Sequence, residues 1–313
     1  MTATFDFDRP LLLDGGTGIE LLKRRVPILT DLWSATALLL APTTVQAVHA
    51  DFIRAGADVV TTNTYGVVRD RLTEGGLGER YAELNRLAGE LANRARDEAG
   101  REVAIAGSLP PLSRSYRPEL VLSFEELLPR YREQAELLAP YVDVYICETM
   151  SSSAEALAAA TAAVEIGKPV WVAFSLHEDH SGRLWSGETV TEAVEALAHL
   201  PIAAFLANCC QPESIDAALG EFGALGKPFG AYANAFKPGL NKRTGYKDRT
   251  LDPGNWDDYE SQSAPLRDDL PPQIFADHAR HWHAGGARIF GGCCGASPDH
   301  IAKLRWVVDE IAS

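Results

Sequence analysis

Short apolar segments rich in β-branched residues recur along the whole chain, and longer stretches with helical periodicity separate them. The apolar segments predict eight strands, at Pro10–Gly16, Ala57–Tyr65, Val103–Pro110, Val142–Thr149, Pro169–Leu176, Ile202–Cys210, Pro228–Ala235 and Ala287–Cys294. Helix-like runs lie between them, among them Tyr81–Ala99, Glu125–Ala139, Ser153–Ile166, Val190–Leu200, Ile215–Leu225 and Ile274–Ala284. Alternating strands and helices indicate parallel pairing with right-handed crossovers. Eight such units predict a (β/α)8 barrel, and we expect one barrel domain over residues 1–313.

A doubly wound open sheet is the alternative fold for this alternation. That fold would place a glycine-rich phosphate turn, G-x-G-x-x-G, after the first strand, and the sequence has none there. No change in composition marks a domain boundary either, so the barrel is preferred. The segment 237–272 is rich in proline and charge and is long for a barrel loop. We expect it to be a loop insertion that lies over the active face.

Polar residues end the predicted strands, namely Asp14, Asn63, Ser108, Glu148, Ser175 with His177, Cys209 with Cys210, Asn234, and Cys293 with Cys294. In a parallel barrel these positions meet at the C-terminal face, where barrel enzymes have their active sites. A polar strand end is also common simply because the chain leaves the core there. The cysteine endings are harder to explain in that way. His177 and His180 fit no zinc motif, and we expect both to be solvent-exposed.

Charge and composition narrow the class of partner. The chain has 29 basic and 43 acidic side chains, for a formal net charge of -14, which repels nucleic-acid phosphates and anionic membrane surfaces. No stretch approaches the roughly 18 apolar residues of a membrane span, and Met1–Arg9 lacks the apolar run of a signal peptide. We therefore expect a soluble, cytoplasmic protein with small-molecule substrates. Five cysteines are too few for a disulfide framework.

Four of the five cysteines form two adjacent pairs, at the ends of the sixth and eighth predicted strands. In a barrel these pairs would face each other across the mouth. Three thiolates and one exchangeable position match a catalytic zinc site, and soft sulfur ligands disfavour magnesium and calcium. Thiolate charge weakens the activation of water but suits the metal to a substrate thiolate. Strand alternation turns only one of Cys209 and Cys210 inward, and it places Cys147 opposite Glu148 as a buried hydrophobic residue.

Six short motifs follow one another along the chain between Leu11 and Leu304, in the order LLLDGGTGIEL, TTNTYG, GSLPP, CET, NCC and GGCCG. Together they resemble the homocysteine S-methyltransferase family. The segments WSATALLLAP and VHADFIRAGADVVTTNTY are similar to the branch that uses S-methylmethionine or S-adenosylmethionine, and betaine-homocysteine methyltransferase is a more distant relative. The resemblance implies a zinc-dependent enzyme that transfers a methyl group from a sulfonium donor to homocysteine, giving methionine.

The resemblance also implies roles for individual residues. The zinc ligands would be Cys209, Cys293 and Cys294, and Cys210 would not be a ligand. Asp14 and the backbone of Gly15 and Gly16 would seat the amino-acid group of homocysteine, and Glu148 would take its ammonium. These roles agree with the chemistry, because a carboxylate pairs with an ammonium and a glycine amide can approach a carboxylate closely.

The methyl donor is less well defined by the sequence. A sulfonium carries positive charge, so the aromatic faces of Tyr65, Trp185 or Trp256 are candidates to hold it by cation–π attraction, with Tyr65 foremost because it ends a strand. We also expect Asn234 to bind substrate. The family often has Tyr-Pro-Asn-Ser at the end of the seventh strand, whereas residues 232–235 here read YANA. Two alternatives stay open: betaine or a partner's methyl-corrinoid as donor, or a zinc-binding barrel without catalytic activity.

Overall fold

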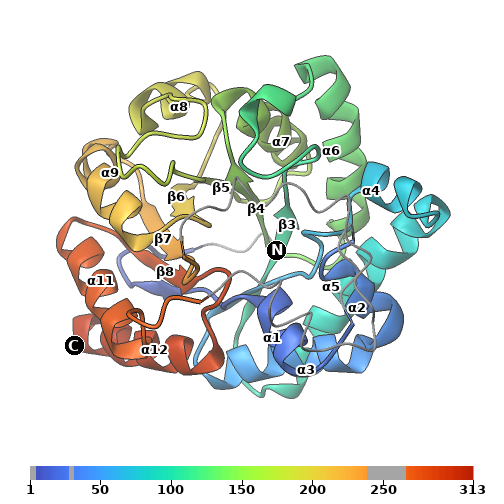
Figure 1. Ribbon diagram of the computed structural model, residues 1–313, viewed down its shortest axis with the longest axis horizontal. Helices are drawn as coiled ribbons and strands as arrows, with labels where there is room; N and C mark the ends of the chain where they lie inside the picture. The colour runs from blue at the N-terminus through green and yellow to red at the C-terminus, as the bar shows by residue number, and fades with distance from the viewer. Residues whose placement is uncertain (1–4, 28–31, 238–265, 313) are drawn as a thin grey trace.

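The computed structural model describes residues 5–27, 32–237 and 266–312. Its sheet has eight parallel strands, β1 (Leu11–Leu12), β2 (Val59–Thr61), β3 (Ala104–Leu109), β4 (Val144–Met150), β5 (Val170–Phe174), β6 (Ala204–Asn208), β7 (Phe229–Ala233) and β8 (Ile289–Gly292). Consecutive strands from β2 to β8 pair, and β8 pairs with β1. A parallel bridge between Leu13 and Val59 links β1 to β2. The sheet therefore closes into the predicted (β/α)8 barrel (Figure 1).

Helices form a ring around the strands (Figure 1). They are α1 (Thr17–Lys23), α2 (Ala35–Leu40), α3 (Pro42–Arg54), α4 (Arg69–Glu74), α5 (Tyr81–Glu98), α6 (Phe124–Leu138), α7 (Ser153–Glu165), α8 (Val190–Ala196), α9 (Pro212–Ala224), α11 (Pro272–Ala284) and α12 (Pro298–Ala312). Helices α1 to α4 are not among the helical runs named from the sequence. Three of them have only six or seven residues, which is too short to show a clear helical period. None of the helices in the described residues is long and apolar enough to span a membrane.

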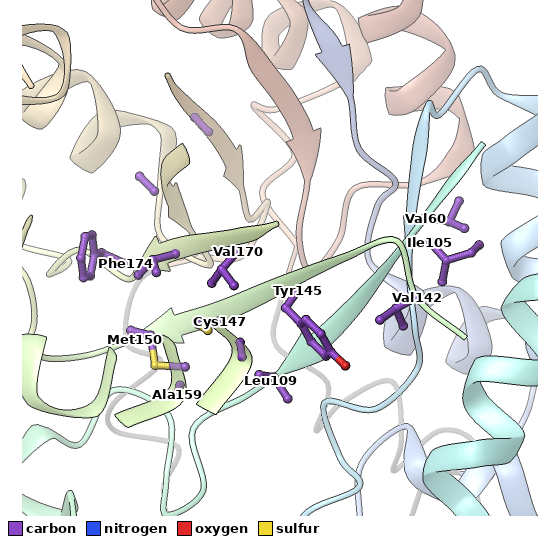
Figure 2. Close-up of a cluster of buried hydrophobic side chains, with 14 of the residues drawn as sticks. Val60, Ile105, Leu109, Val142, Tyr145, Cys147, Met150, Ala159, Val170 and Phe174 are labelled. Atoms are coloured by element: carbon purple, nitrogen blue, oxygen red, sulfur yellow. The ribbon is translucent and has the colours of Figure 1, made fainter. Parts of the chain in front are cut away.

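The strands are buried on both faces, as parallel strands in a barrel must be. Along β4, Val144 and Ile146 belong to the cluster inside the barrel, whereas Tyr145 and Cys147 belong to the cluster between the sheet and the helices (Figure 2). This alternation places the next residue, Glu148, on the inner face. Cys147 is a fully buried hydrophobic residue of the outer cluster, as its position beside Glu148 predicted.

Aromatic residues fill the N-terminal end of the barrel interior. Trp171 of β5 belongs to the inner cluster, and its ring lies 4.8 Å from that of Phe5 and 6.1 Å from that of Phe7, between centroids. Phe5 and Phe7 precede β1 in the chain and pack against the inner cluster. The polar residues of the barrel interior consequently lie at its other end, the C-terminal face.

The predicted loop insertion at 237–272 is described only at its ends, because residues 238–265 lie outside the described part of the chain. Phe236 and Leu266 form an antiparallel bridge, and the amide of Arg267 donates to the carbonyl of Ala235 at 2.7 Å. Both ends of the loop therefore meet just beyond β7, at the C-terminal face, and α11 begins soon afterwards at Pro272.

Candidate active site

The inner face of the barrel changes from apolar to polar at the C-terminal ends of the strands. Residues two positions beyond an apolar inner residue share its face, because side chains alternate along a strand. By this rule the inner polar residues are Thr61 after Val59, Ser108 after Ala106, Glu148 after Ile146, Ser175 after Ala173, Asn208 after Leu206 and Asn234 after Tyr232. All but Thr61 are buried. The predicted strand endings Ser108, Glu148, Ser175 and Asn234 thus lie in one polar layer, which the cysteines adjoin. Asn63 is not in it, because its side-chain amide donates to the carbonyl of Ser34 at 3.0 Å.

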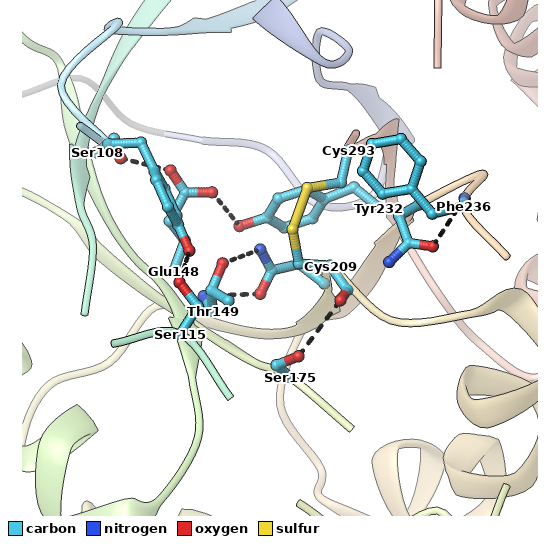
Figure 3. The surroundings of a disulfide bond; sticks show 12 residues. Ser108, Ser115, Glu148, Thr149, Ser175, Cys209, Tyr232, Phe236 and Cys293 are labelled. Atoms are coloured by element: carbon cyan, nitrogen blue, oxygen red, sulfur yellow. Dashed lines mark hydrogen bonds between the residues drawn. A yellow bond between two sulfur atoms is a disulfide. The ribbon is translucent and has the colours of Figure 1, made fainter. Parts of the chain in front are cut away.

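The three predicted metal ligands come together next to this layer. The Sγ atoms of Cys209, Cys293 and Cys294 all lie within 4.8 Å of one another. Cys209 and Cys293 are joined by a disulfide, with their Cα atoms 5.6 Å apart, and Cys294 is free (Figure 3). The sequence analysis does not anticipate this disulfide. A sulfur in a disulfide is not a thiolate, so the disulfide and metal ligation by Cys209 and Cys293 are alternative states of one site.

The backbone at the end of β6 determines which cysteine reaches the site. Asn208 is on the inner face, so regular alternation would turn Cys209 outward. Cys209 instead has a φ of 51°, a left-handed conformation that interrupts the strand and keeps its side chain at the barrel mouth. The next residue, Cys210, is buried in the outer hydrophobic cluster. The structure therefore places Cys209, and not Cys210, beside the other two sulfurs.

The cysteine cluster suits a soft divalent metal once the disulfide is reduced. Zinc–sulfur bonds of about 2.3 Å place the sulfurs of a tetrahedral site roughly 3.8 Å apart, within the observed separation. Within the described residues, this is the only group of three or more histidine, cysteine, aspartate or glutamate side chains close enough to share an ion. Burial raises the pKa of Cys294 to about 12, so without a metal this thiol stays protonated at neutral pH.

Glu148 lies beside the cysteine cluster inside the barrel (Figure 3). The hydroxyl of Ser108 donates to its Oε1, and the hydroxyl of Tyr232 donates to its Oε2 at 3.4 Å. Both bonds favour the ionised carboxylate, but burial outweighs them and raises the pKa of Glu148 to about 7. A positively charged ligand at this place would restore the ionised form.

Asp14 provides a second buried carboxyl, immediately after β1. It accepts hydrogen bonds from the amide of Thr61 at 2.8 Å and from the Thr61 hydroxyl at 3.0 Å. Burial, with a smaller contribution from the charge of Glu148, raises the pKa of Asp14 to about 7 despite these bonds. The two carboxyls therefore act on each other, and together they make an acidic pocket suited to an ammonium group.

The two glycines after Asp14 allow the loop after β8 to pack closely. A Cβ on Gly15 would lie 2.5 Å from the carbonyl oxygen of Ala296, and one on Gly16 would lie 2.6 Å from that of Cys293. The amide of Gly16 also donates to Ala296 at 3.0 Å. The predicted roles of the Gly15 and Gly16 backbone in seating the amino-acid group of homocysteine stay predictions.

The aromatic candidates for the donor site, Tyr65 and Trp185, each contact residues of the loops beyond the strands. The hydroxyl of Tyr65 shares a hydrogen bond of 2.6 Å with Ser115. The ring centroid of Trp185 lies 5.3 Å from that of Tyr116 and 4.5 Å from that of His177. Burial raises the pKa of Tyr116, and the charges of Tyr65 and Cys294 add to this shift.

The two histidines after β5 differ in their surroundings. His177 is not simply exposed, because its ring packs against Trp185, whereas His180 is exposed and its ring pairs with Gln211 at 3.0 Å. The third candidate for the donor, Trp256, lies outside the described residues.

Some site residues were missed by the sequence analysis. Thr61 and Asn208 could have been found from strand alternation, since each lies two positions beyond an apolar inner residue. Tyr116 lies in an irregular loop with a φ of 63°, where no periodic signal exists.

Asn234, which is named from the sequence, is buried as an inner strand ending, and its Oδ1 accepts from the amide of Phe236 at 3.2 Å.

Comparison with known proteins agrees with this geometry. A sequence model of the homocysteine S-methyltransferase family matches residues 11–308. The homocysteine S-methyltransferase of Escherichia coli K12 is 31% identical over 97% of both chains. Crystal structures of the homocysteine methyltransferase MmuM from Escherichia coli superpose with TM-scores of 0.76 for a metallated form and 0.77 for an oxidized form, each at 28% identity. They cover 95% of this chain and 96% and 95% of theirs. The chain therefore belongs to the homocysteine S-methyltransferase family of enzymes.

Proposed function

We propose that this protein uses zinc to transfer a methyl group from a sulfonium, S-methylmethionine or S-adenosylmethionine, to homocysteine, giving methionine. The observation that carries the proposal is the position of three cysteine sulfurs, mutually within 4.8 Å, next to two buried carboxyls. A metallated form of the related Escherichia coli enzyme supports the metal. Both substrates are small molecules.

Cys209, Cys293 and Cys294 would hold the zinc. When bound, zinc supplies a Lewis acid that favours the thiolate form of a thiol at neutral pH. Glu148 and Asp14 face the same space and would pair with the ammonium of homocysteine, which fixes where its sulfur lies. The protein's remaining contribution is alignment of that sulfur with the methyl group and its leaving sulfur, since such transfer needs the three atoms in line.

The aromatic residues near the cysteines would hold the methyl donor. A sulfonium is attracted to the faces of aromatic rings; Trp185 packs against Tyr116, whose hydroxyl is influenced by Tyr65 and Cys294. The donor's positive charge also agrees with the net charge of -14 and with the acidic pocket below. Asn234 remains a predicted substrate contact, since its Nδ2 is buried without a hydrogen-bond partner.

Replacing Trp185 with leucine is expected to raise the KM for the sulfonium donor about 3- to 30-fold, because a desolvated cation–π contact contributes roughly 0.5–2 kcal/mol. The KM for homocysteine should change little. Steady-state kinetics with each substrate varied in turn measure both values. Trp306→Leu is the matched control, because Trp306 is 61% exposed on the outer helix α12. Equal effects on both KM values would contradict a donor-binding role for Trp185.

The proposed reaction is tested on protein that has first been reduced, because the Cys209–Cys293 disulfide would exclude the metal. Zinc-loaded protein is incubated with homocysteine and, separately, S-methylmethionine, S-adenosylmethionine or betaine, and methionine is measured by mass spectrometry. We expect methionine from a sulfonium, and none after a chelator removes the zinc. Methionine from betaine alone, or a zinc-loaded protein that is inactive with every donor, would show the proposal to be wrong.

A further inference from the structure

Two strand ends that are not neighbours in the sheet are tied together by one pair of side chains. The amide of Thr149 donates to Oδ1 of Asn208 at 2.8 Å, and Nδ2 of Asn208 donates to the hydroxyl of Thr149 at 3.0 Å (Figure 3). Thr149 belongs to β4 and Asn208 to β6, and β5 lies between these strands. Both residues are fully buried. We call this pair the Thr149–Asn208 clamp.

The clamp holds backbone that is not regular strand. Thr149 has a φ of 61° and Cys209 has a φ of 51°, a left-handed conformation that residues with a Cβ rarely adopt. The pairing of β4 with β5 also shifts register between Cys147 and Met150. Such backbone persists only where its surroundings fix it. The two clamp bonds fix it on both sides, since one uses the Thr149 amide itself and the other anchors the residue before Cys209.

Each member of the clamp is the sequence neighbour of a residue of the proposed site. Thr149 follows Glu148, the carboxyl proposed for the homocysteine ammonium, and Asn208 precedes Cys209, a proposed metal ligand. A second bond supports Cys209 from β5, because the hydroxyl of Ser175 donates to its carbonyl at 3.4 Å. The separation between the carboxyl of Glu148 and the sulfur of Cys209 therefore depends on the clamp.

That separation matters for one substrate in particular. Homocysteine carries its ammonium and its sulfur on the same short chain, so the two anchors must match the distance between these groups. We infer that Thr149 and Asn208 are positioning residues, which set the spacing between the ammonium anchor and the metal and thereby the fit of homocysteine. The inference rests on the proposed function. It assigns no contact with substrate to either residue.

Thr149→Val and Thr149→Ser test the inference as a matched pair. Valine has the shape of threonine but removes the acceptor for Asn208, whereas serine keeps it. In Thr149→Val we expect the KM for homocysteine to rise and the zinc affinity to fall, each by about 10- to 100-fold, the usual effect of losing a residue that orients a metal ligand. Thr149→Ser should stay within about threefold of the natural protein in both.

The measurements separate positioning from a purely structural role. Zinc affinity is read by competition with a chromophoric chelator on reduced protein, KM and kcat by methionine formation, and thermal stability on the zinc-free proteins. A Thr149→Val protein that loses stability but keeps its zinc affinity and KM would overturn the inference. If Thr149→Val does not fold, Asn208→Asp is measured instead, because it keeps the acceptor for the Thr149 amide and removes the donor. Failure of both variants to fold would also overturn it.

These outcomes differ from failure of the proposed function. Zinc competition reports on the clamp whether or not methionine forms. A natural protein that holds zinc but methylates nothing would contradict the proposed reaction while leaving the effect of Thr149→Val on zinc affinity to decide the clamp.

Discussion

Replacement of Cys293 with serine is expected to abolish zinc binding and methyl transfer together. Serine keeps the size of the side chain, but its hydroxyl stays protonated and is a poor ligand for a soft metal. Only Cys209 and Cys294 would remain, and two thiolates do not complete the site. We expect zinc content to fall from about one ion per chain to nearly none, and kcat/KM to fall by at least about a thousandfold, as loss of several kcal/mol of metal stabilisation requires.

Cys210→Ser is the control for this prediction. Cys210 adjoins a proposed ligand in sequence but is buried in the hydrophobic layer between sheet and helices, so it should not affect the metal. We expect zinc content and kcat/KM near those of the natural protein, with some loss of stability from a hydroxyl placed in an apolar core. Metal analysis and methionine formation measure both variants. A zinc-loaded, active Cys293→Ser protein would refute the ligand assignment.

The barrel could be predicted from the sequence because its strands leave a repeated local signal. Each strand is an apolar segment buried on both faces, and the segments alternate with helical runs, so counting them is enough to predict closure. Their lengths were overestimated: Ala57–Tyr65 was predicted as strand, but β2 covers only Val59–Thr61. The polar residues that follow, 62–64, lie beyond the strand, and their side chains bond to one another and to the carbonyls of Ser34 and Ser108.

The residues of the site could be predicted only as far as alternation and motif allow. Alternation separates Glu148 from Cys147, and it predicts that only one of Cys209 and Cys210 faces the barrel interior, without deciding which. It does not predict the left-handed backbone at Cys209, because that conformation is held by contacts with other strands. The Cys209–Cys293 disulfide and the bond from the Gly16 amide to Ala296 are also long-range features, because they join the end of β8 to the ends of β6 and β1.

Glu148→Gln is expected to raise the KM for homocysteine about 10- to 100-fold with little change in zinc content. Glutamine keeps the shape of the side chain, and its oxygen can still accept from one of the Ser108 and Tyr232 hydroxyls while its NH2 group donates to the other, but it cannot pair as an anion with the substrate ammonium. A hydrogen bond to a charged group contributes roughly 1.5–3 kcal/mol, which gives this range. Steady-state kinetics at pH 8 and metal analysis measure the two quantities. An unchanged KM would show that the ammonium binds elsewhere.

Glu148→Gln is expected to stabilise the zinc-free protein although it weakens homocysteine binding, and the pH dependence separates these two effects. The pKa of Glu148 is raised from 4.5 to about 7 in the folded protein, mainly by burial, so its contribution to stability is present below about pH 4.5 and is lost as the pH rises through 7. Zinc-free Glu148→Gln should therefore be more stable than the natural protein at pH 8, and this difference should shrink toward pH 5.

The natural enzyme's KM for homocysteine should rise below pH 7, where the carboxyl is protonated. A weaker dependence is expected in the variant, in which Asp14 is the remaining carboxyl of the pocket; burial still raises its pKa, but the smaller contribution of the Glu148 charge is gone. If Glu148 destabilises the substrate-free protein and is yet needed for a low KM, its role is in binding homocysteine. Equal stability and an unchanged KM in Glu148→Gln would show that Glu148 does not bind the substrate.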